Sequence, residues 1–122
     1  MKRARIQIRK DADAALNESF AGALEAATSG KPADPVATFT FSSPAQLFTV
    51  ISPKRWDLIE RLQQAGPCSI RSLARLLDRD VKRVHEDVST LLDWGIVERN
   101  AAGAVFVPYD VIHADFDLKA VA

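Results

Sequence analysis

The sequence predicts an α+β fold. Three segments with helical periodicity follow one another between residues 52 and 95, and a hairpin signal comes directly after them. Stretches in which apolar and polar residues alternate lie before and after this block, which indicates strands on either side of it. With 122 residues, of which 48% are hydrophobic, the chain has the size of one domain, or of one domain with a folded arm.

The first two helices of the central block have clear start and stop signals. Ser52 is placed to cap the first helix, and Pro53 suits its first position because the missing N–H has no partner there. Gly66-Pro67 ends this helix, since glycine readily adopts positive φ and proline does not continue a helix. Ser69 then caps a second helix that runs to Leu77.

The third helix is predicted from Val81 to Trp94. Asp80 caps it after the polar link of residues 78–80, and Gly95 ends it. Its apolar residues recur at helical spacing and are expected to be buried: Val81, Val84, Val88, Leu91 and Leu92.

Two β-rich runs, residues 96–99 and 104–107, flank a hairpin signal from Asn100 to Gly103. The order helix, helix, short polar turn, helix and hairpin is that of a winged helix-turn-helix. In such a domain two short helices support a third, whose outer face is free to enter the major groove of DNA. We therefore expect residues 44–109 to form a winged helix-turn-helix DNA-binding domain.

Several runs of this block resemble known families. Residues 91–97 look like the exit from the recognition helix in winged-helix regulators of the multiple-antibiotic-resistance-regulator (MarR) type, and residues 69–77 are similar to their second helix. More narrowly, residues 47–58, 80–88 and 107–110 resemble a family of small prokaryotic DNA-binding proteins. Members of that family are often antitoxin-like and paired with a small toxin, so the resemblance implies an antitoxin role.

Residues 1–43 are predicted as a strand-helix-strand extension. Residues 1–10 alternate basic residues with Ile6 and Ile8, which suits either a DNA-contacting arm or an edge strand kept soluble by its charge. Asp11 to Ser29 has the apolar stripe of a helix, and Val36 to Phe41 alternates as a second strand. Because a strand and helix placed here have little core to join within one chain, we infer that they mediate dimerisation.

Two elements complete the predicted organisation. Ser43-Pro44 repeats the cap-then-proline signal and predicts a short helix through Ile51. Residues 110–122 are predicted as a C-terminal strand and tail, with alternation from Val111 to Leu118 and an acidic outer face that carries His113. The last four residues are expected to fray.

The net charge of the chain does not indicate a nucleic-acid partner, because its 16 basic and 16 acidic residues cancel. Local charge is more informative. Residues 71–83 hold five basic residues against two acidic ones, whereas residues 100–122 hold three acidic residues against one basic residue. This polarity is expected if one face meets phosphate and another does not, and a charge-laced solvated surface is the alternative.

The candidate DNA-reading residues lie on the outer side of the third helix. Arg83 is the best candidate for guanine, because its planar guanidinium matches the O6 and N7 atoms of that base. The same half of the helix also presents Lys82, His85, Glu86 and Ser89. Glu86 either accepts a hydrogen bond from a cytosine amine or pairs with Lys82 four residues earlier.

Phosphate-positioning residues are expected on the first two helices, in the turn and in the hairpin. They are Lys54, Arg55, Arg71, Arg75, Arg79 and Arg99. Arg71 and Arg75 have an alternative role in ion pairs with Asp78 or Asp57.

No catalytic, cofactor or metal site is expected, and we predict a non-enzyme. Neither His85 nor His113 stands in a nucleophile motif, and the five glycines form no phosphate-binding loop. A weak metal site at His113, Asp115 and Asp117 is less favoured than solvated strand residues. The single cysteine, Cys68, is expected to be a small turn or core residue. Because neither a signal peptide nor a membrane-spanning run is predicted, a cytoplasmic location is expected.

These features together predict a homodimeric, sequence-specific DNA-binding protein that represses transcription. The resemblance implies repression of its own operon as an antitoxin, with a toxin docking on the N-terminal element or on the acidic C-terminal strand. A winged-helix protein-interaction module without DNA contact is the alternative, because Glu86 and Asp87 stand beside Lys82 and Arg83. A ligand-responsive regulator ranks last, because no polar groups gather in an apolar stretch to form a pocket.

Overall fold

The computed structural model describes residues 1–9 and 36–120. Its elements are β1 (Arg3–Ile8), β2 (Val36–Phe41), α2 (Pro44–Val50), α3 (Pro53–Ala65), α4 (Ile70–Leu77), α5 (Val81–Trp94), β3 (Glu98–Arg99), β4 (Val105–Phe106) and β5 (Val111–Ala114). The chain therefore has an α+β fold, as its sequence predicts. The helix expected from Asp11 to Ser29 lies outside the described residues.

The helices begin where their capping residues predict. The Oγ atoms of Ser43 and Ser69 and the carboxylate of Asp80 each accept a hydrogen bond from the backbone N–H three residues later, at 3.0, 3.1 and 3.4 Å. Ser52 has the extended backbone of a cap, but its side chain caps no N–H within the described part of the chain. Pro53 at the first helical position leaves one donor fewer to satisfy, so α3 begins at the predicted residue all the same.

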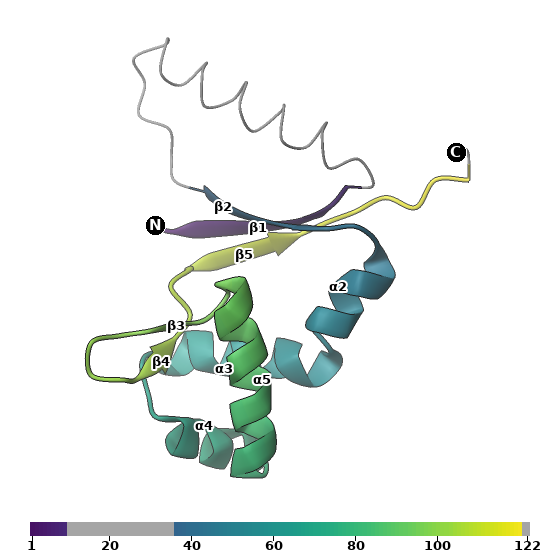
Figure 1. Ribbon diagram of the computed structural model, residues 1–122. Coiled ribbons are helices and arrows are strands. Elements are labelled where there is room, and N and C mark those ends of the chain that lie inside the picture. The colour runs from purple at the N-terminus through teal and green to yellow at the C-terminus, as the bar shows by residue number, and fades with distance from the viewer. Residues whose placement is uncertain (10–35, 121–122) are drawn as a thin grey trace, which may run out of the picture.

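The strands from the two ends of the chain form one parallel sheet in the order β2-β1-β5. Ala4 of β1 lies opposite Ala37 of β2 and Ile112 of β5. Figure 1 shows the sheet above the helices, with one face turned toward them. Because β1 is the central strand, the expectation that it forms an edge strand is wrong.

The sheet and the helices share one hydrophobic core. Ile6 of β1 and Phe41 of β2 are each 1% exposed and belong to the same cluster as Leu58 of α3 and Val88 of α5. Phe41 also stacks on Trp94 at the end of α5, with ring centroids 4.6 Å apart. The N-terminal strands therefore join the core of their own chain, contrary to the expectation from the sequence. Dimerisation through residues 1–43 loses the support that it drew from that expectation.

The last strand and the hairpin strands are shorter than predicted. β5 ends at Ala114, and beyond it Phe116 and Leu118 are 39% and 81% exposed instead of lying on a strand face. β3 and β4 have two residues each, and the N–H groups of Ile96 and Val97 donate to the carbonyl oxygen of Leu91 in α5 and not to a strand partner. The alternation of residue types therefore predicts the presence of these strands better than their length.

The packing of Phe41 gives a first testable prediction. Phe41→Ala is expected to lower the free energy of unfolding by about 3–5 kcal/mol, because it leaves a cavity between the sheet and α5. Phe48→Ala is the matched control, since Phe48 is 49% exposed on α2, and it is expected to cost less than about 1 kcal/mol. Urea unfolding followed by tryptophan fluorescence measures both, and equal losses would contradict the assigned core.

Candidate nucleic-acid interface

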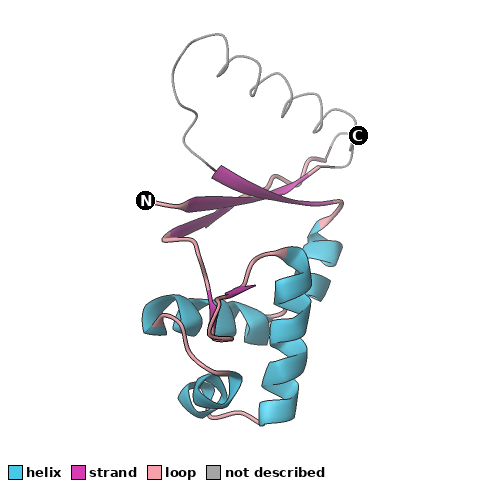
Figure 2. Cartoon of the chain, turned by 60° about the vertical axis from the view of Figure 1, so that its left-hand side comes forward, coloured by secondary structure: helices cyan, strands magenta, loops and turns pink. Residues whose placement is uncertain are grey.

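The candidate surface lies at the end of the helical block farthest from the sheet. Figures 1 and 2 both show α4 and the first turns of α5 there. Asp78 ends α4 in the left-handed conformation, with φ of 51°, and Asp80 caps α5. The chain therefore passes from one helix to the next through residues 78–80 alone.

α5 has a buried side and an exposed side. Val84, Val88 and Leu91 are buried against the core. The opposite side exposes four of the predicted reading residues: Lys82, Arg83, His85 and Glu86. Ser89 is half-buried, and its Oγ donates a hydrogen bond to the carbonyl oxygen of His85 at 2.9 Å. These side chains therefore share one helix face, which carries both signs of charge.

Arg71 and Arg75 lie beside this face on α4, and both are exposed. They line an open cavity of about 440 Å³ between α4 and the start of α5. Within the described residues neither arginine forms the ion pair with Asp57 or Asp78 that was the alternative to phosphate contact. Both guanidinium groups are therefore placed to meet an anion.

Val81 lines the same cavity. The helical spacing predicts it as a core residue, but its side chain is 43% exposed. The prediction is wrong because Val81 is the first residue of α5, where the helix projects beyond the core that covers Val84 and Val88.

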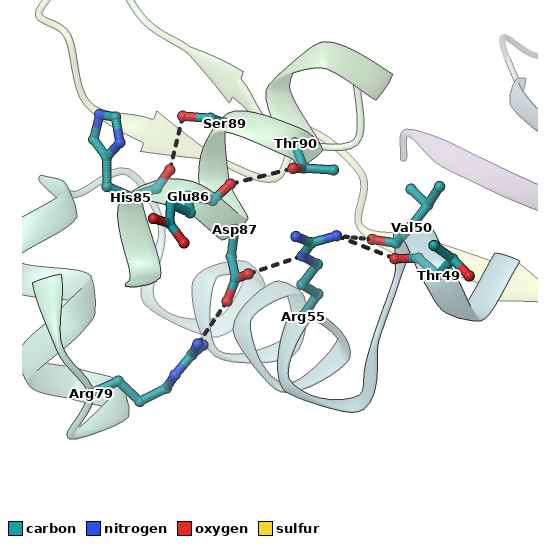
Figure 3. A network of polar contacts seen from close by, with 9 residues as sticks. All are labelled: Thr49, Val50, Arg55, Arg79, His85, Glu86, Asp87, Ser89 and Thr90. Atoms are coloured by element: carbon teal, nitrogen blue, oxygen red, sulfur yellow. Dashed lines mark hydrogen bonds and ion pairs between the residues drawn. The ribbon is translucent and has the colours of Figure 1, made fainter. Parts of the chain in front are cut away.

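Arg55 and Arg79, in contrast, form ion pairs within the protein. Figure 3 shows both guanidinium groups on the carboxylate of Asp87, with Arg55 Nε 3.0 Å from Oδ1 and Arg79 Nη2 2.7 Å from Oδ2. Arg55 Nη1 also donates to the carbonyl oxygens of Val50 at 2.8 Å and Thr49 at 3.4 Å, where α2 ends. The three charged side chains are only 14–20% exposed. We therefore assign Arg55 and Arg79 to the frame of the site and no longer to phosphate contact.

Sequence reasoning noted Asp87 only as an acidic neighbour of the reading residues. A signal was present, because Asp87 stands three residues after Val84 and four before Leu91, on the edge of the buried side of α5. A carboxylate in such a position requires a partner, since burying an unpaired charge is costly. Its partners come from α3 and from the turn, which periodicity within α5 does not reveal.

The remaining predicted phosphate contacts are exposed but lie apart from the α4–α5 cavity. Lys54 is in the first turn of α3, next to the end of α2. Arg99 is in β3, and its Nη1 donates to the carbonyl oxygen of Gly103 at 3.0 Å. The Oδ1 of Asn100 accepts two further backbone hydrogen bonds within the turn, at 3.0 and 2.9 Å. Arg99 therefore sits on a hairpin whose tip is held by its own side chains.

Cys68 ties the hairpin to the loop between α3 and α4. Its N–H donates to the carbonyl oxygen of Val105 at 3.1 Å, and the N–H of Val105 donates back to its carbonyl oxygen at 2.9 Å. Burial raises the pKa of the Cys68 thiol, which disfavours the reactive thiolate. The thiol therefore belongs to a turn residue that packs against the core, as the sequence predicts.

The described residues form neither a metal cluster nor a membrane span. Among them, no group of three or more His, Cys, Asp or Glu side chains is placed to hold a metal ion. His113 Nε2 lies 3.6 Å from Asp115 Oδ1, and both side chains are well exposed. None of the helices in the described ranges is long and apolar enough to cross a membrane.

The fold and the site define an α+β protein in which a three-helix block with a hairpin presents an exposed, arginine-flanked helix. The model of the HVO_A0114 family matches residues 50–114, and the chain belongs to this family. The matched region covers α3 to β5 and leaves β1 and β2 outside it. No curated protein and no solved structure matches the chain.

The ion pairs of Asp87 give a second prediction. Asp87→Asn leaves two part-buried guanidinium groups without a counter-charge, so we expect the free energy of unfolding to fall by about 2 kcal/mol. Asp93→Asn is the matched control on the same helix, because Asp93 is exposed, and it is expected to change stability by less than about 0.5 kcal/mol. Chemical denaturation measures both, and an unchanged Asp87→Asn protein would show that the network adds nothing to stability.

Proposed function

We propose that this chain is a sequence-specific DNA-binding regulator of transcription, in which residues 44–109 act as a winged helix-turn-helix. The observation that carries the proposal is the exposed outer face of α5, which stands beside the arginines of α4 across a short turn. A helix supported in this way matches the width of the DNA major groove.

Each part of the surface has a role in this proposal. Arg83 reads a guanine with its planar guanidinium, and the neighbouring side chains of α5 adjust the fit to the base edges. Arg71 and Arg75 bind phosphates and set the position of α5 along the duplex. The hairpin serves as the wing, with Arg99 on the backbone or in the minor groove. The backbone pairing between Cys68 and Val105 supports this role, because it holds the base of the hairpin against the helices.

We also propose a homodimer. Two copies would present α5 to half-sites about one helical turn, ~34 Å, apart. In this proposal the protein binds in the cytoplasm, where prokaryotic DNA lies, and has no enzymatic activity.

An antitoxin role follows from the resemblance to antitoxin-like DNA-binding proteins, with repression of its own operon. The acidic segment after β5 supports a docking role, because Asp115 and Asp117 are exposed and follow directly on the last strand. An acidic segment of this kind complements a basic toxin surface and speeds its association.

A protein-interaction module without DNA contact is the second candidate. The exposed face of α5 favours it in one respect, because Glu86 lies beside Lys82 and Arg83 and repels phosphate. Asp87, the other acidic residue on which this alternative rested, is bound to Arg55 and Arg79. The arginines on α4 and the proximity of the hairpin favour DNA. The two candidates differ in whether the chain prefers its own upstream DNA.

The main test is fluorescence anisotropy on the DNA upstream of its gene and on a scrambled duplex of equal composition, over a salt series. We expect the chain to prefer the upstream DNA and its affinity to fall with salt concentration, as several phosphate contacts require.

Single substitutions separate the two kinds of contact. Arg83→Ala should cost about 1–3 kcal/mol of binding free energy on the upstream DNA, whereas Arg71→Ala should weaken binding to both duplexes and lower the salt slope by about one. Arg3→Ala, on the exposed face of the sheet, is the control expected to change neither. Equal or absent binding to both duplexes would favour the interaction module.

The antitoxin role requires a small toxin encoded beside this chain, and it is tested by co-expression with the product of the neighbouring gene. We expect that protein to arrest growth, this chain to restore growth, and the double variant Asp115→Asn/Asp117→Asn to restore it poorly while still binding DNA. Point changes are preferred to removal of residues 110–122, because β5 pairs with β1 in the sheet. Lys119→Gln is the control in the same segment. If the neighbouring protein is harmless, or if the double variant neutralises it fully, the proposed docking role of this segment is wrong.

A further inference from the structure

Val81 is an apolar side chain set among cationic ones. It lies at the first position of α5, is 43% exposed, and lines the α4–α5 cavity together with Arg71 and Arg75. A single exposed valine is ordinary on a protein surface. Its place is informative, because the cavity opens beside the face of α5 that is proposed to read DNA.

The chemistry around Val81 restricts what it can contact. The guanidinium groups of Arg71 and Arg75 bind phosphate well, so the group that enters the cavity is expected to belong to a nucleotide. Asp78 also lines the cavity, and its carboxylate disfavours an anion inside it, so the arginines are expected to bind phosphates outside the cavity. An apolar side chain in the same cavity as two phosphate-binding side chains therefore suits a base on the DNA strand whose backbone the arginines hold.

Among the four bases, only thymine presents a methyl group in the major groove. We propose that Val81 determines specificity by contact with the C5-methyl group of a thymine, while Arg71 and Arg75 hold the backbone of the same strand. This inference rests on the proposed function, since it requires α5 to enter the major groove.

Arg79 has no part in this contact although it lines the same cavity. Its Nη2 is bound to Asp87, and its Nη1 is buried. Its role is to hold the turn that precedes Val81. Arg71 and Arg75 come from α4 and Val81 from α5, so the relative placement of these two helices sets the distance between the phosphate and methyl contacts.

The test begins with selection of preferred sites from a random duplex pool by the full chain. Each thymine of a selected site is then replaced by deoxyuridine, which removes only the C5-methyl group. We expect one thymine in each half-site whose replacement weakens binding of the unmodified chain about fourfold, the fold-change for one buried methyl group. In Val81→Ala the same replacement should have almost no effect, and Val81→Ile should keep the discrimination.

Leu76→Ala is the matched control, because Leu76 is also an exposed aliphatic residue, 44% exposed, but lines a different cavity with Arg61 and Gln64. It should discriminate thymine from deoxyuridine as the unmodified chain does. Selective binding in which no thymine is sensitive to methyl removal, or in which Val81→Ala remains equally sensitive, would overturn the inference and leave the proposed function standing. Failure to select any site would overturn both.

Discussion

The position of α5 depends on the carboxylate of Asp87. This one group binds Arg55 of α3 and Arg79 of the turn, and Arg55 continues the network to the carbonyl oxygens at the end of α2. Part-buried charges of this kind stabilise little when compared with apolar packing, but they are costly to break and they allow few alternative arrangements. The network therefore joins the middle of α5 to α3, to the turn before α5 and to the end of α2.

The C-terminal end of α5 is held by aromatic contacts with the sheet. Trp94 stacks on Phe41 of β2, and the hydroxyl of Tyr109 donates to the carbonyl oxygen of Gly95 at 3.2 Å. Phe39 meets the ring of Tyr109 edge-on, with centroids 5.8 Å apart. Because α5 is held at its middle by Asp87 and at its C-terminal end by these aromatic contacts, its exposed face is supported along most of the helix. Such support for a binding surface reduces the ordering cost of association.

The charges of this protein cancel in sum but are separated in space. The chain is neutral overall, yet exposed arginines lie beside the α4–α5 cavity and exposed aspartates follow β5 near the other end of the molecule. In the proposed DNA complex the net charge of the chain supplies no attraction, so the local arginines and the short-range contacts of α5 carry the binding. An apolar contact such as that proposed for Val81 belongs to that short-range class.

The sequence by itself determined the local structure: Ser69 and Asp80 start their helices, Gly95 ends α5, and alternation marks the strands. These features depend on residues within one turn or a few positions of each other, so local physics decides them. The tertiary structure alone decided that β1 is the central strand, that Asp87 binds two arginines from other elements, and that Val81 escapes burial. Each of these depends on which distant segments become neighbours, and neither periodicity nor capping carries that information.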